Sequence, residues 1–275
     1  MDRAEIKSWL QDRPYVLEAV ELQDPKGQAG ERKRKKLNEV AGFCEVILRY
    51  VRKWQSERDP LRILECACGK SYLGVVLRLL LEDALDMDVR LTGNDVDEKL
   101  VEKCRRVAGE AGAEDARYIA ERTLDVAEGE DFDLLISLHA CDTATDEAIA
   151  RGIQLEVPLI LAVPCCQNQI RGQLKGDRSL EGMTEFGPAR YRLANLLTDS
   201  LRAQFLKSAG YEVQMDEITS PRVTPKNLCI CARKIRNPSG SRRDRQYREL
   251  RDFFGVKPAV EKFCPEVLEA ETRVD

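Results

Sequence analysis

The sequence predicts an α/β protein with a seven-stranded, mostly parallel β-sheet. Between residues 60 and 234, short apolar runs alternate with amphipathic helical stretches, which is typical of parallel strands joined by crossover helices. Only residues 220–226 separate the last two apolar runs, which is too short for a crossover helix. One strand of the sheet should therefore run antiparallel. The chain has 275 residues, which is enough to bury a sizeable core.

Each element follows from the local pattern of apolar residues. An N-terminal helix is expected because apolar residues between Leu37 and Val51 recur at intervals of three and four. Strands are expected at residues 62–66, 89–93, 117–120, 134–138, 158–163, 211–219 and 227–234. Helices are expected at residues 72–85, 98–111, 145–151 and 189–209. Residues 27–30 and 237–241 are interpreted as linkers, which gives an N-terminal helical lobe (1–59), a central domain (60–235) and a basic helical extension (236–275).

The loop after the first expected strand indicates a binding site for a small molecule. Ligands of open parallel sheets bind at the carboxyl ends of the strands. Residues 64–74 have neither the glycine spacing of a P-loop nor that of a dinucleotide-binding loop. Glu65 is followed instead by Ala67 and Gly69, two small residues that allow a ligand to approach the backbone closely.

The end of the second expected strand narrows the choice of ligand. Asp95 would lie at its tip, where a carboxylate can accept hydrogen bonds from both hydroxyls of a ribose. Glu65 would face a cationic or hydrogen-bond-donating group and not a phosphate. S-adenosylmethionine fits both acidic residues, because it has an amino acid at one end, a ribose in the middle and no phosphate. The alternative is a tight turn followed by a helix that Asp97 caps.

Four motifs together resemble a group of class I S-adenosylmethionine-dependent methyltransferases that includes relatives acting on RNA. They are Glu-Cys-Ala-Cys-Gly-Lys-Ser-Tyr-Leu (65–73), Leu-His-Ala-Cys-Asp-Thr-Ala-Thr-Asp (138–146), Val-Pro-Cys-Cys-Gln (163–167) and Thr-Pro-Lys-Asn (224–227). The resemblance covers about residues 35–234 and implies a Rossmann-like class I methyltransferase fold with S-adenosyl-L-methionine as cofactor. The cofactor-binding residues that it implies are Glu65, Ala67, Gly69, Asp95, Asp125 and Leu138.

The first loop departs from the acidic–x–Gly–x–Gly pattern of such enzymes. Glu65 replaces the usual Asp, and Ala67 replaces the first Gly. Because of these departures, the protein could alternatively be a binding module that keeps the fold and binds the cofactor but does not catalyse methyl transfer.

The chemistry is expected at the ends of the fourth and fifth strands, where three interpretations compete. His139 could act as a general base with Asp142 as its orienting partner or as a substrate anchor. Cys165 or Cys166 could instead attack a substrate covalently, as a thiolate nucleophile. The third interpretation is a thiol or metal protein that uses side chains expected to converge at the strand tips, namely Cys66, Cys68, His139, Cys141, Cys165 and Cys166. The Cys66-x-Cys68 and Cys165-Cys166 spacings are unusual for chelation, so no metal ligand is predicted.

The charge distribution favours RNA as the substrate. Residues 26–53 and 233–257 each carry a balance of +6 within a chain of net charge -4. If these segments meet, they could bind phosphates; otherwise residues 31–36 form a solvated loop and residues 241–254 a solvated helix face. Candidate substrate-binding residues are Lys35, Lys36, Arg202 and Asn227. Asp199 and Arg202 could also pair on the helix surface, and Asn227 could cap its turn. A small molecule or a protein is the alternative substrate.

Composition indicates the compartment. The chain has ten cysteines and one histidine, and its first residues contain no apolar signal segment, so we expect reduced thiols in the cytoplasm. No apolar run approaches 18 residues, so no membrane-spanning helix is expected.

Overall fold

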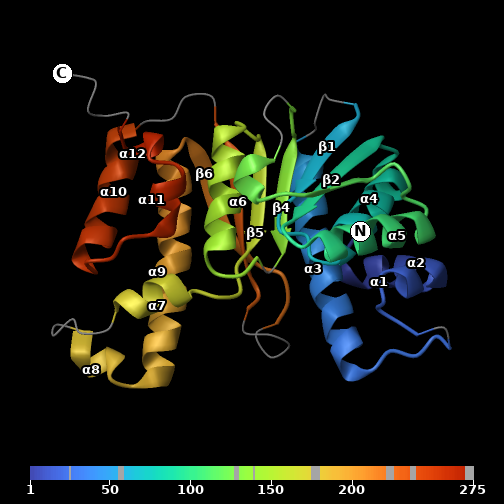
Figure 1. Ribbon diagram of the computed structural model, residues 1–275, viewed down its shortest axis with the longest axis horizontal. Helices are drawn as coiled ribbons and strands as arrows, with labels where there is room; N and C mark the ends of the chain where they lie inside the picture. The colour runs from blue at the N-terminus through green and yellow to red at the C-terminus, as the bar shows by residue number, and fades with distance from the viewer. Residues whose placement is uncertain are drawn as a thin grey trace.

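Seven strands form one sheet in the order β3-β2-β1-β4-β5-β7-β6 in the computed structural model (Figure 1). The structure describes residues 1–24, 26–54, 59–126, 130–138, 140–174, 180–220, 226–235 and 240–269. The strands are β1 (Leu61–Glu65), β2 (Val89–Asp95), β3 (Arg117–Ala120), β4 (Leu134–Leu138), β5 (Leu159–Val163), β6 (Tyr211–Glu217) and β7 (Leu228–Lys234). Strand β7 is antiparallel to both β5 and β6, whereas the remaining pairs are parallel. The predicted sheet with one reversed strand is confirmed.

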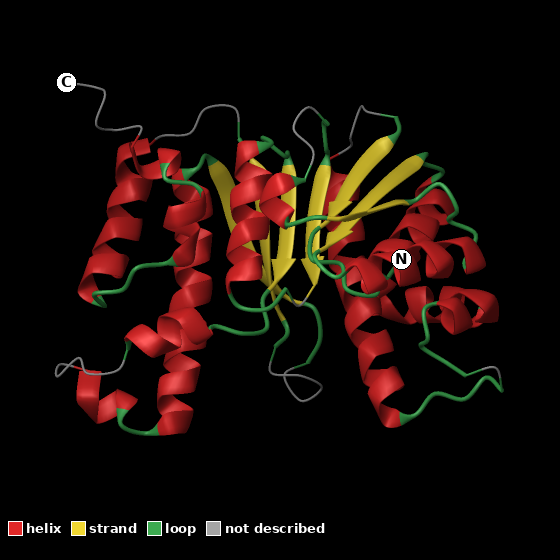
Figure 2. Ribbon diagram, in the orientation of Figure 1, coloured by secondary structure: helices red, strands yellow, loops and turns green. Residues whose placement is uncertain are grey.

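Helices cover both faces of the sheet (Figure 2). They are α1 (Arg3–Gln11), α2 (Pro14–Ala19), α3 (Glu31–Trp54), α4 (Tyr72–Leu85), α5 (Glu98–Glu110), α6 (Thr143–Gln154), α7 (Asn168–Gln173), α8 (Glu181–Thr184), α9 (Gly187–Ser208), α10 (Gly240–Phe253), α11 (Ala259–Phe263) and α12 (Glu266–Glu269). A short 3₁₀ helix, η1 (Thr123–Asp125), follows β3. The interpretation of residues 31–36 as a loop is wrong, because Glu31 begins α3 and pairs with Lys35 one turn later.

The strands alternate between two apolar layers, as side chains of a buried sheet must. In β5, Leu159 and Leu161 join the layer that includes α1, α3, α4 and α5, whereas Ile160 joins the layer that includes α6, α9 and α10. In β7, Cys229 and Cys231 both face the first layer and are buried, as their alternation predicts. The N-terminal and C-terminal helices therefore share their apolar contacts with the central sheet, while the three-part division of the chain stays a prediction.

The carboxyl ends of the parallel strands define one edge of the molecule. Figure 1 shows α3 and α9 extending past this edge, one on each side of it. The N-terminal turns of both helices lie there, because the chain enters each helix from that end. The strand tips are thus flanked by the beginnings of two long helices.

The helical parts of the two basic segments lie apart, although Lys53 of the first and Arg233 of the second line one pocket together. Helix α3 belongs to one layer of the protein, whereas α10 lies beyond α9 on the other, on the far side of the sheet (Figure 1). A joint phosphate-binding surface made by residues 26–53 and 233–257 therefore stays a prediction, with Lys53 and Arg233 marking one place where the two segments share a surface. Among the described helices, none is long and apolar enough to cross a membrane.

Candidate functional site

The Glu65 carboxyl group holds the loop between β1 and α4 in place. Glu65 is only 2% exposed at the end of β1. It accepts a short hydrogen bond from the Ser71 hydroxyl and another from the Gly74 backbone N–H at 3.1 Å. Burial raises the pKa of Glu65 to about 7, although these two donors and the nearby Lys36 oppose the increase. Glu65 therefore faces its own loop, where its partners are neutral donors.

Close packing in and around this network explains why residues 74 and 93 are glycines. A Cβ atom at Gly74 would lie 2.2 Å from Glu65 Oε2, so any larger residue would push the carboxyl group away. A Cβ atom at Gly93 would lie 2.7 Å from the Tyr118 ring. The hydroxyl of Tyr118 lies 2.9 Å from that of Ser71, which extends the network to β3. Sequence reasoning missed Ser71 and Tyr118, although the two crowded glycines were a usable signal.

The tip of β2 leaves room for a ligand beside this loop. Asp95 Oδ2 accepts from the Gly69 backbone N–H at 2.9 Å, and its Oδ1 accepts from Asp97 N–H at 3.1 Å. Each carboxylate oxygen retains a further lone pair. A Cβ atom at Gly69 would meet nothing within 4 Å, and Val96 is 72% exposed. The tip therefore combines a carboxylate, an open glycine backbone and an exposed apolar side chain.

These groups fit S-adenosylmethionine. The Asp95 oxygens can accept from a ribose diol, the open side of Gly69 admits the ligand to the backbone, and Val96 offers an apolar surface for the adenine ring. Asp97 is occupied elsewhere, since it caps α5 through Lys99 N–H at 2.9 Å. The cap that sequence reasoning weighed as an alternative thus coexists with a ligand-binding arrangement.

The remaining predicted cofactor residues lie along the same edge. Ala67 adopts a left-handed backbone with φ 49°, within the loop that Glu65 holds. Asp125 ends η1, whose Thr123 accepts a hydrogen bond from Asn94 of β2 at 3.1 Å. Leu138 ends β4, next to β1 in the sheet.

An N-terminal residue braces the first loop from outside. Glu21 has a positive φ of 57° and accepts from Lys70 Nζ at 2.8 Å, from Tyr72 at 2.9 Å and from Lys103. The two ammonium groups of Lys103 and Lys70 lower the pKa of Glu21 to about 2. Glu21 and these partners are separated by between 49 and 82 positions in the sequence, so no local pattern could have predicted the contacts.

The β4 and β5 ends bring together several of the predicted catalytic residues. Asp142 precedes α6 with a positive φ of 53° and a ψ of -116°, a conformation that costs an L residue energy. Its Oδ1 accepts from the Gln169 N–H at 3.0 Å, and its carbonyl accepts from Arg202 Nη2 at 2.8 Å. The loop after β4 is thereby held from α7 and from α9. His139 lies outside the described residues.

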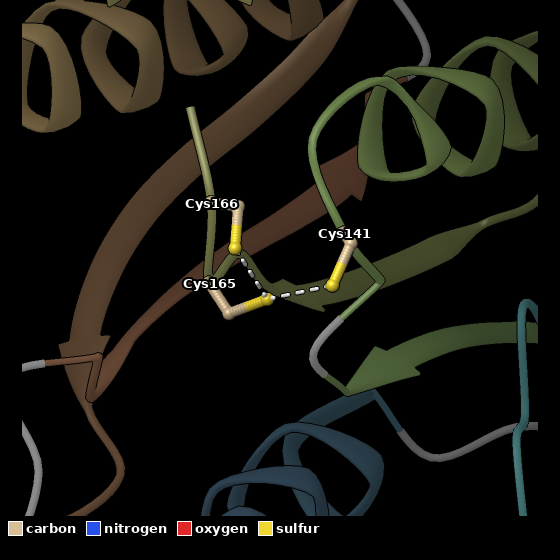
Figure 3. Close-up of side chains that lie close together, drawn as sticks. All are labelled: Cys141, Cys165 and Cys166. Carbon is tan, nitrogen blue, oxygen red and sulfur yellow. Dashed lines mark hydrogen bonds between the residues drawn. The ribbon is translucent and has the colours of Figure 1, made fainter. Parts of the chain in front are cut away.

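Three thiols meet at this edge. The sulfur of Cys141 lies 3.5 Å from that of Cys165, which lies 3.6 Å from that of Cys166 (Figure 3). Partial burial, together with the two neighbouring thiols, raises the pKa of Cys165, and a thiol with a raised pKa is a poor nucleophile. This electrostatic environment argues against covalent attack by Cys165.

Arg202 is the centre of a buried ion-pair network. Its guanidinium binds Asp146 through two hydrogen bonds of 3.0 and 2.7 Å and lies 3.4 Å from Asp199 Oδ1. The arginine is 1% exposed, so the pair with Asp199 forms in the interior and not on the helix surface as expected. Burial lowers the pKa of Arg202, but Asp146 and Asp199 outweigh this effect and raise it. The guanidinium is thus occupied within the protein, which corrects its assignment to direct substrate contact.

The three other predicted substrate residues have structural partners. Asn227 is buried and donates to the Thr219 carbonyl at 2.7 Å, so it links the start of β7 to the residues that follow β6. Lys35 pairs with Glu31 at 2.8 Å on an exposed face of α3. Lys36 pairs with Glu39 at 3.6 Å, and its positive charge also opposes the increase in the pKa of Glu65.

A cationic group borders the thiols on the side of α9. Lys226 donates to Gln167 Oε1 at 2.9 Å, and its ammonium lies 4.8 Å from the centre of the Tyr191 ring. Arg171 lies over the same ring at 5.9 Å. Gln167 in turn donates to Asp199 at 3.3 Å, which links this group to the buried network. Sequence reasoning missed Arg171 and Tyr191, because no periodic pattern joins α7 to α9.

Comparison with known proteins gives one decisive match. A family model described as a methyltransferase domain matches residues 35–173. A search among curated proteins gave no significant match.

The solved structures found by comparison have low sequence identity to this chain. Magnesium protoporphyrin IX methyltransferase from Synechocystis PCC 6803, solved with bound S-adenosylmethionine, is 13% identical with a TM-score of 0.49, over 86% of this chain and 98% of that one. Precorrin-6y C5,15-methyltransferase from Geobacter metallireducens GS-15 is 12% identical with a TM-score of 0.44, over 70% of this chain and 89% of that one. The family assignment therefore depends on the match over residues 35–173.

Proposed function

Because this chain belongs to the methyltransferase-domain family, we propose that it transfers the methyl group of S-adenosylmethionine to an RNA. Membership of the family supports methyl transfer from S-adenosylmethionine in general. The RNA substrate is the proposal, and the position of cations around the strand tips is the observation that carries it.

The cofactor site proposed for this activity is the edge formed by β1 and β2. Asp95 would accept the ribose hydroxyls, Gly69 would admit the cofactor to the backbone, and Val96 would cover one side of the adenine. When bound, S-adenosylmethionine supplies a methyl group activated by its sulfonium charge. Glu65 would act indirectly, because it holds the loop that carries Gly69 and does not itself contact the cofactor.

The acceptor site proposed for this activity lies at the ends of β4 and β5. Methyl transfer is an in-line displacement, so the enzyme must hold its nucleophile in one orientation. Asp142 and the residues beside it are suited to this task, because α7 and α9 fix their backbone. His139 is the proposed proton acceptor on the basis of the sequence, and it lies outside the described residues.

Cations on two sides of this edge support a polyanionic substrate. The first turns of α3 hold five consecutive basic residues, Arg32, Lys33, Arg34, Lys35 and Lys36. Figure 1 shows this end of α3 on the side of the sheet where the parallel strands end. On the other side, Arg171 and Lys226 surround Tyr191, which is 38% exposed. Phosphates would contact the cations, and an aromatic side chain could stack on an unpaired base.

The proposal is tested by labelled methyl transfer. The protein is incubated with S-adenosylmethionine carrying a radioactive methyl group and, separately, with RNA, protein and small-molecule fractions from cells that lack the gene. We expect label in the RNA fraction, with a rate that falls as salt increases. Label confined to the protein or small-molecule fraction would contradict the RNA substrate while leaving the methyltransferase activity intact.

The proposed role of His139 has its own test. His139→Ala should lower the turnover number more than the affinity for S-adenosylmethionine, because a general base acts on the chemical step. An unchanged turnover number would remove His139 from catalysis.

A further inference from the structure

We propose that Cys141, Cys165 and Cys166 bind one thiophilic metal ion of the Zn²⁺ type. The three thiols come from two separate loops, one after β4 and one after β5 (Figure 3). Their sulfur atoms all lie within 4.8 Å of one another. This site is separate from the methyl-donor site that Asp95 defines.

The sulfur positions match the geometry of a thiolate-bound metal. A tetrahedral zinc ion with Zn–S bonds of about 2.3 Å places its sulfur ligands roughly 3.8 Å apart. The distances here are 3.5 Å between Cys141 and Cys165 and 3.6 Å between Cys165 and Cys166. Small rotations of the side chains would therefore suffice to receive the ion. Figure 3 shows the sulfur of Cys165 between the other two.

The backbone that carries these thiols is held by a second set of contacts. Asp142, next to Cys141, is fixed through Arg202 and the Gln169 N–H. Gln167, next to Cys166, is fixed through Lys226 and Asp199. Supporting contacts of this kind orient ligands and strengthen metal affinity. The buried network thus gives the thiols a defined spacing before an ion arrives.

A second pair of close thiols shows what distinguishes this cluster. Cys229 and Cys231 also have sulfurs in contact, at 3.4 Å, but both are buried on a single strand, and among the described residues no third potential metal ligand joins them. In the proposed site, by contrast, Cys141 is exposed and Cys165 and Cys166 are partly exposed. An ion from solution can therefore reach the cluster, and soft thiolate ligands favour Zn²⁺ or Cu⁺ over Mg²⁺ or Ca²⁺.

Binding of the ion exchanges thiol protons for metal–sulfur bonds. Each thiol loses one proton to solvent, and three metal–sulfur bonds form to Zn²⁺, with no change of oxidation state. Three protein ligands leave the fourth position of a tetrahedral ion to water or to a substrate atom. That position would face the edge where the strands end.

The test measures binding of Zn²⁺ itself to the full chain, purified under reducing conditions and stripped with a chelator. Zn²⁺ is titrated in competition with a chromophoric chelator, and Co²⁺ replaces it in a parallel sample to reveal thiolate-to-metal absorption. We expect one ion per chain and a strong thiolate band. Cys141→Ser and Cys166→Ser should each weaken binding by more than the roughly 10- to 100-fold that loss of an outer contact costs.

Cys264→Ala serves as the matched control, because this thiol lies in the C-terminal helices and contacts Glu266. It should retain wild-type affinity for Zn²⁺. Circular dichroism confirms that each variant is folded before titration. The proposal is overturned if the folded, reduced wild-type protein binds no Zn²⁺, or if all variants bind it as wild type does.

Discussion

The two ends of the edge formed by the strand tips, at the proposed cofactor site and at the proposed acceptor site, bury their carboxyl groups among different partners. At the cofactor end, Glu65 is buried among neutral donors, and burial raises its pKa to about 7. At the acceptor end, Asp146 and Asp199 are buried against the guanidinium of Arg202. A lone buried carboxyl group tends to take up a proton, whereas a buried ion pair keeps its charges and depends on each partner. Burial also raises the pKa of Asp199, although Arg202 opposes the increase, so the two ends differ in the charged partner that the carboxyl groups contact. The Glu65 end should therefore respond most clearly to pH, and the Arg202 end to loss of its cation.

The largest effect is expected at the acceptor end. Arg202→Met leaves two buried carboxylates without their cation, so we expect the free energy of unfolding to fall by about 3–5 kcal/mol. Urea unfolding at pH 7 measures this change. Arg192→Met, on an exposed turn of the same helix, is the control and should change stability by less than about 0.5 kcal/mol. Equal effects of the two substitutions would show that the network does not stabilise the fold.

The next effect concerns the dependence of stability on pH. Between its usual pKa of 4.5 and its folded pKa of about 7, Glu65 holds a proton in the folded chain that the unfolded chain releases. The free energy of unfolding should therefore fall as pH rises through this window, by roughly 3 kcal/mol. Glu65→Gln removes this loss, because an amide does not titrate.

Urea unfolding of wild type and Glu65→Gln at several pH values checks this expectation, with the exposed Glu114→Gln as control. The difference between wild type and Glu65→Gln should widen in favour of the variant as pH rises from 4.5 to 7. Parallel stability curves for all three proteins would mean that Glu65 is ionised in the folded state throughout.

A smaller effect is expected on cofactor affinity. Asp95→Asn replaces a charged acceptor of the ribose hydroxyls with a neutral one, which should cost about 2 kcal/mol, or roughly 30-fold in the dissociation constant of S-adenosylmethionine. Asp88→Asn lies exposed just before the opposite end of β2 and should bind normally. Calorimetry compares the two variants, and equal affinities would remove Asp95 from the ribose site.

The smallest effect is expected on the proposed RNA contact. Arg171→Met removes one cation from the Tyr191 group and should raise the KM for RNA roughly 5-fold, with a shallower salt dependence. Arg106→Met, exposed on α5 away from the acceptor end, is the control. A KM that is equal in both variants would place the RNA elsewhere.

The same two ends show why part of the site could be predicted from the sequence. The contacts of Glu65 reach Ser71 and Gly74, six and nine positions away, within one strand–turn–helix segment. Local spacing therefore predicted the loop, and the alternating apolar runs predicted the order of strands and helices.

Contacts at the acceptor end join distant segments. Arg202 reaches Asp146 across 56 positions, and Lys226 reaches Gln167 across 59. A helix period indicated that Arg202 and Asp199 could pair, but it could not show that α6 would cover them. The order of strands predicted that Cys141 would lie near Cys165 and Cys166, but the local spacing of the cysteines argued against a metal site, and only the fold shows sulfur atoms at metal-binding distances.

Titration of S-adenosylmethionine into the wild-type protein tests the central claim most directly. Calorimetry should show one binding site per chain, and S-adenosylhomocysteine should compete for it, because both ligands carry the ribose that Asp95 is placed to bind. Absence of binding by either ligand, in a sample whose circular dichroism shows the folded protein, would contradict the assignment of this edge as a methyl-donor site.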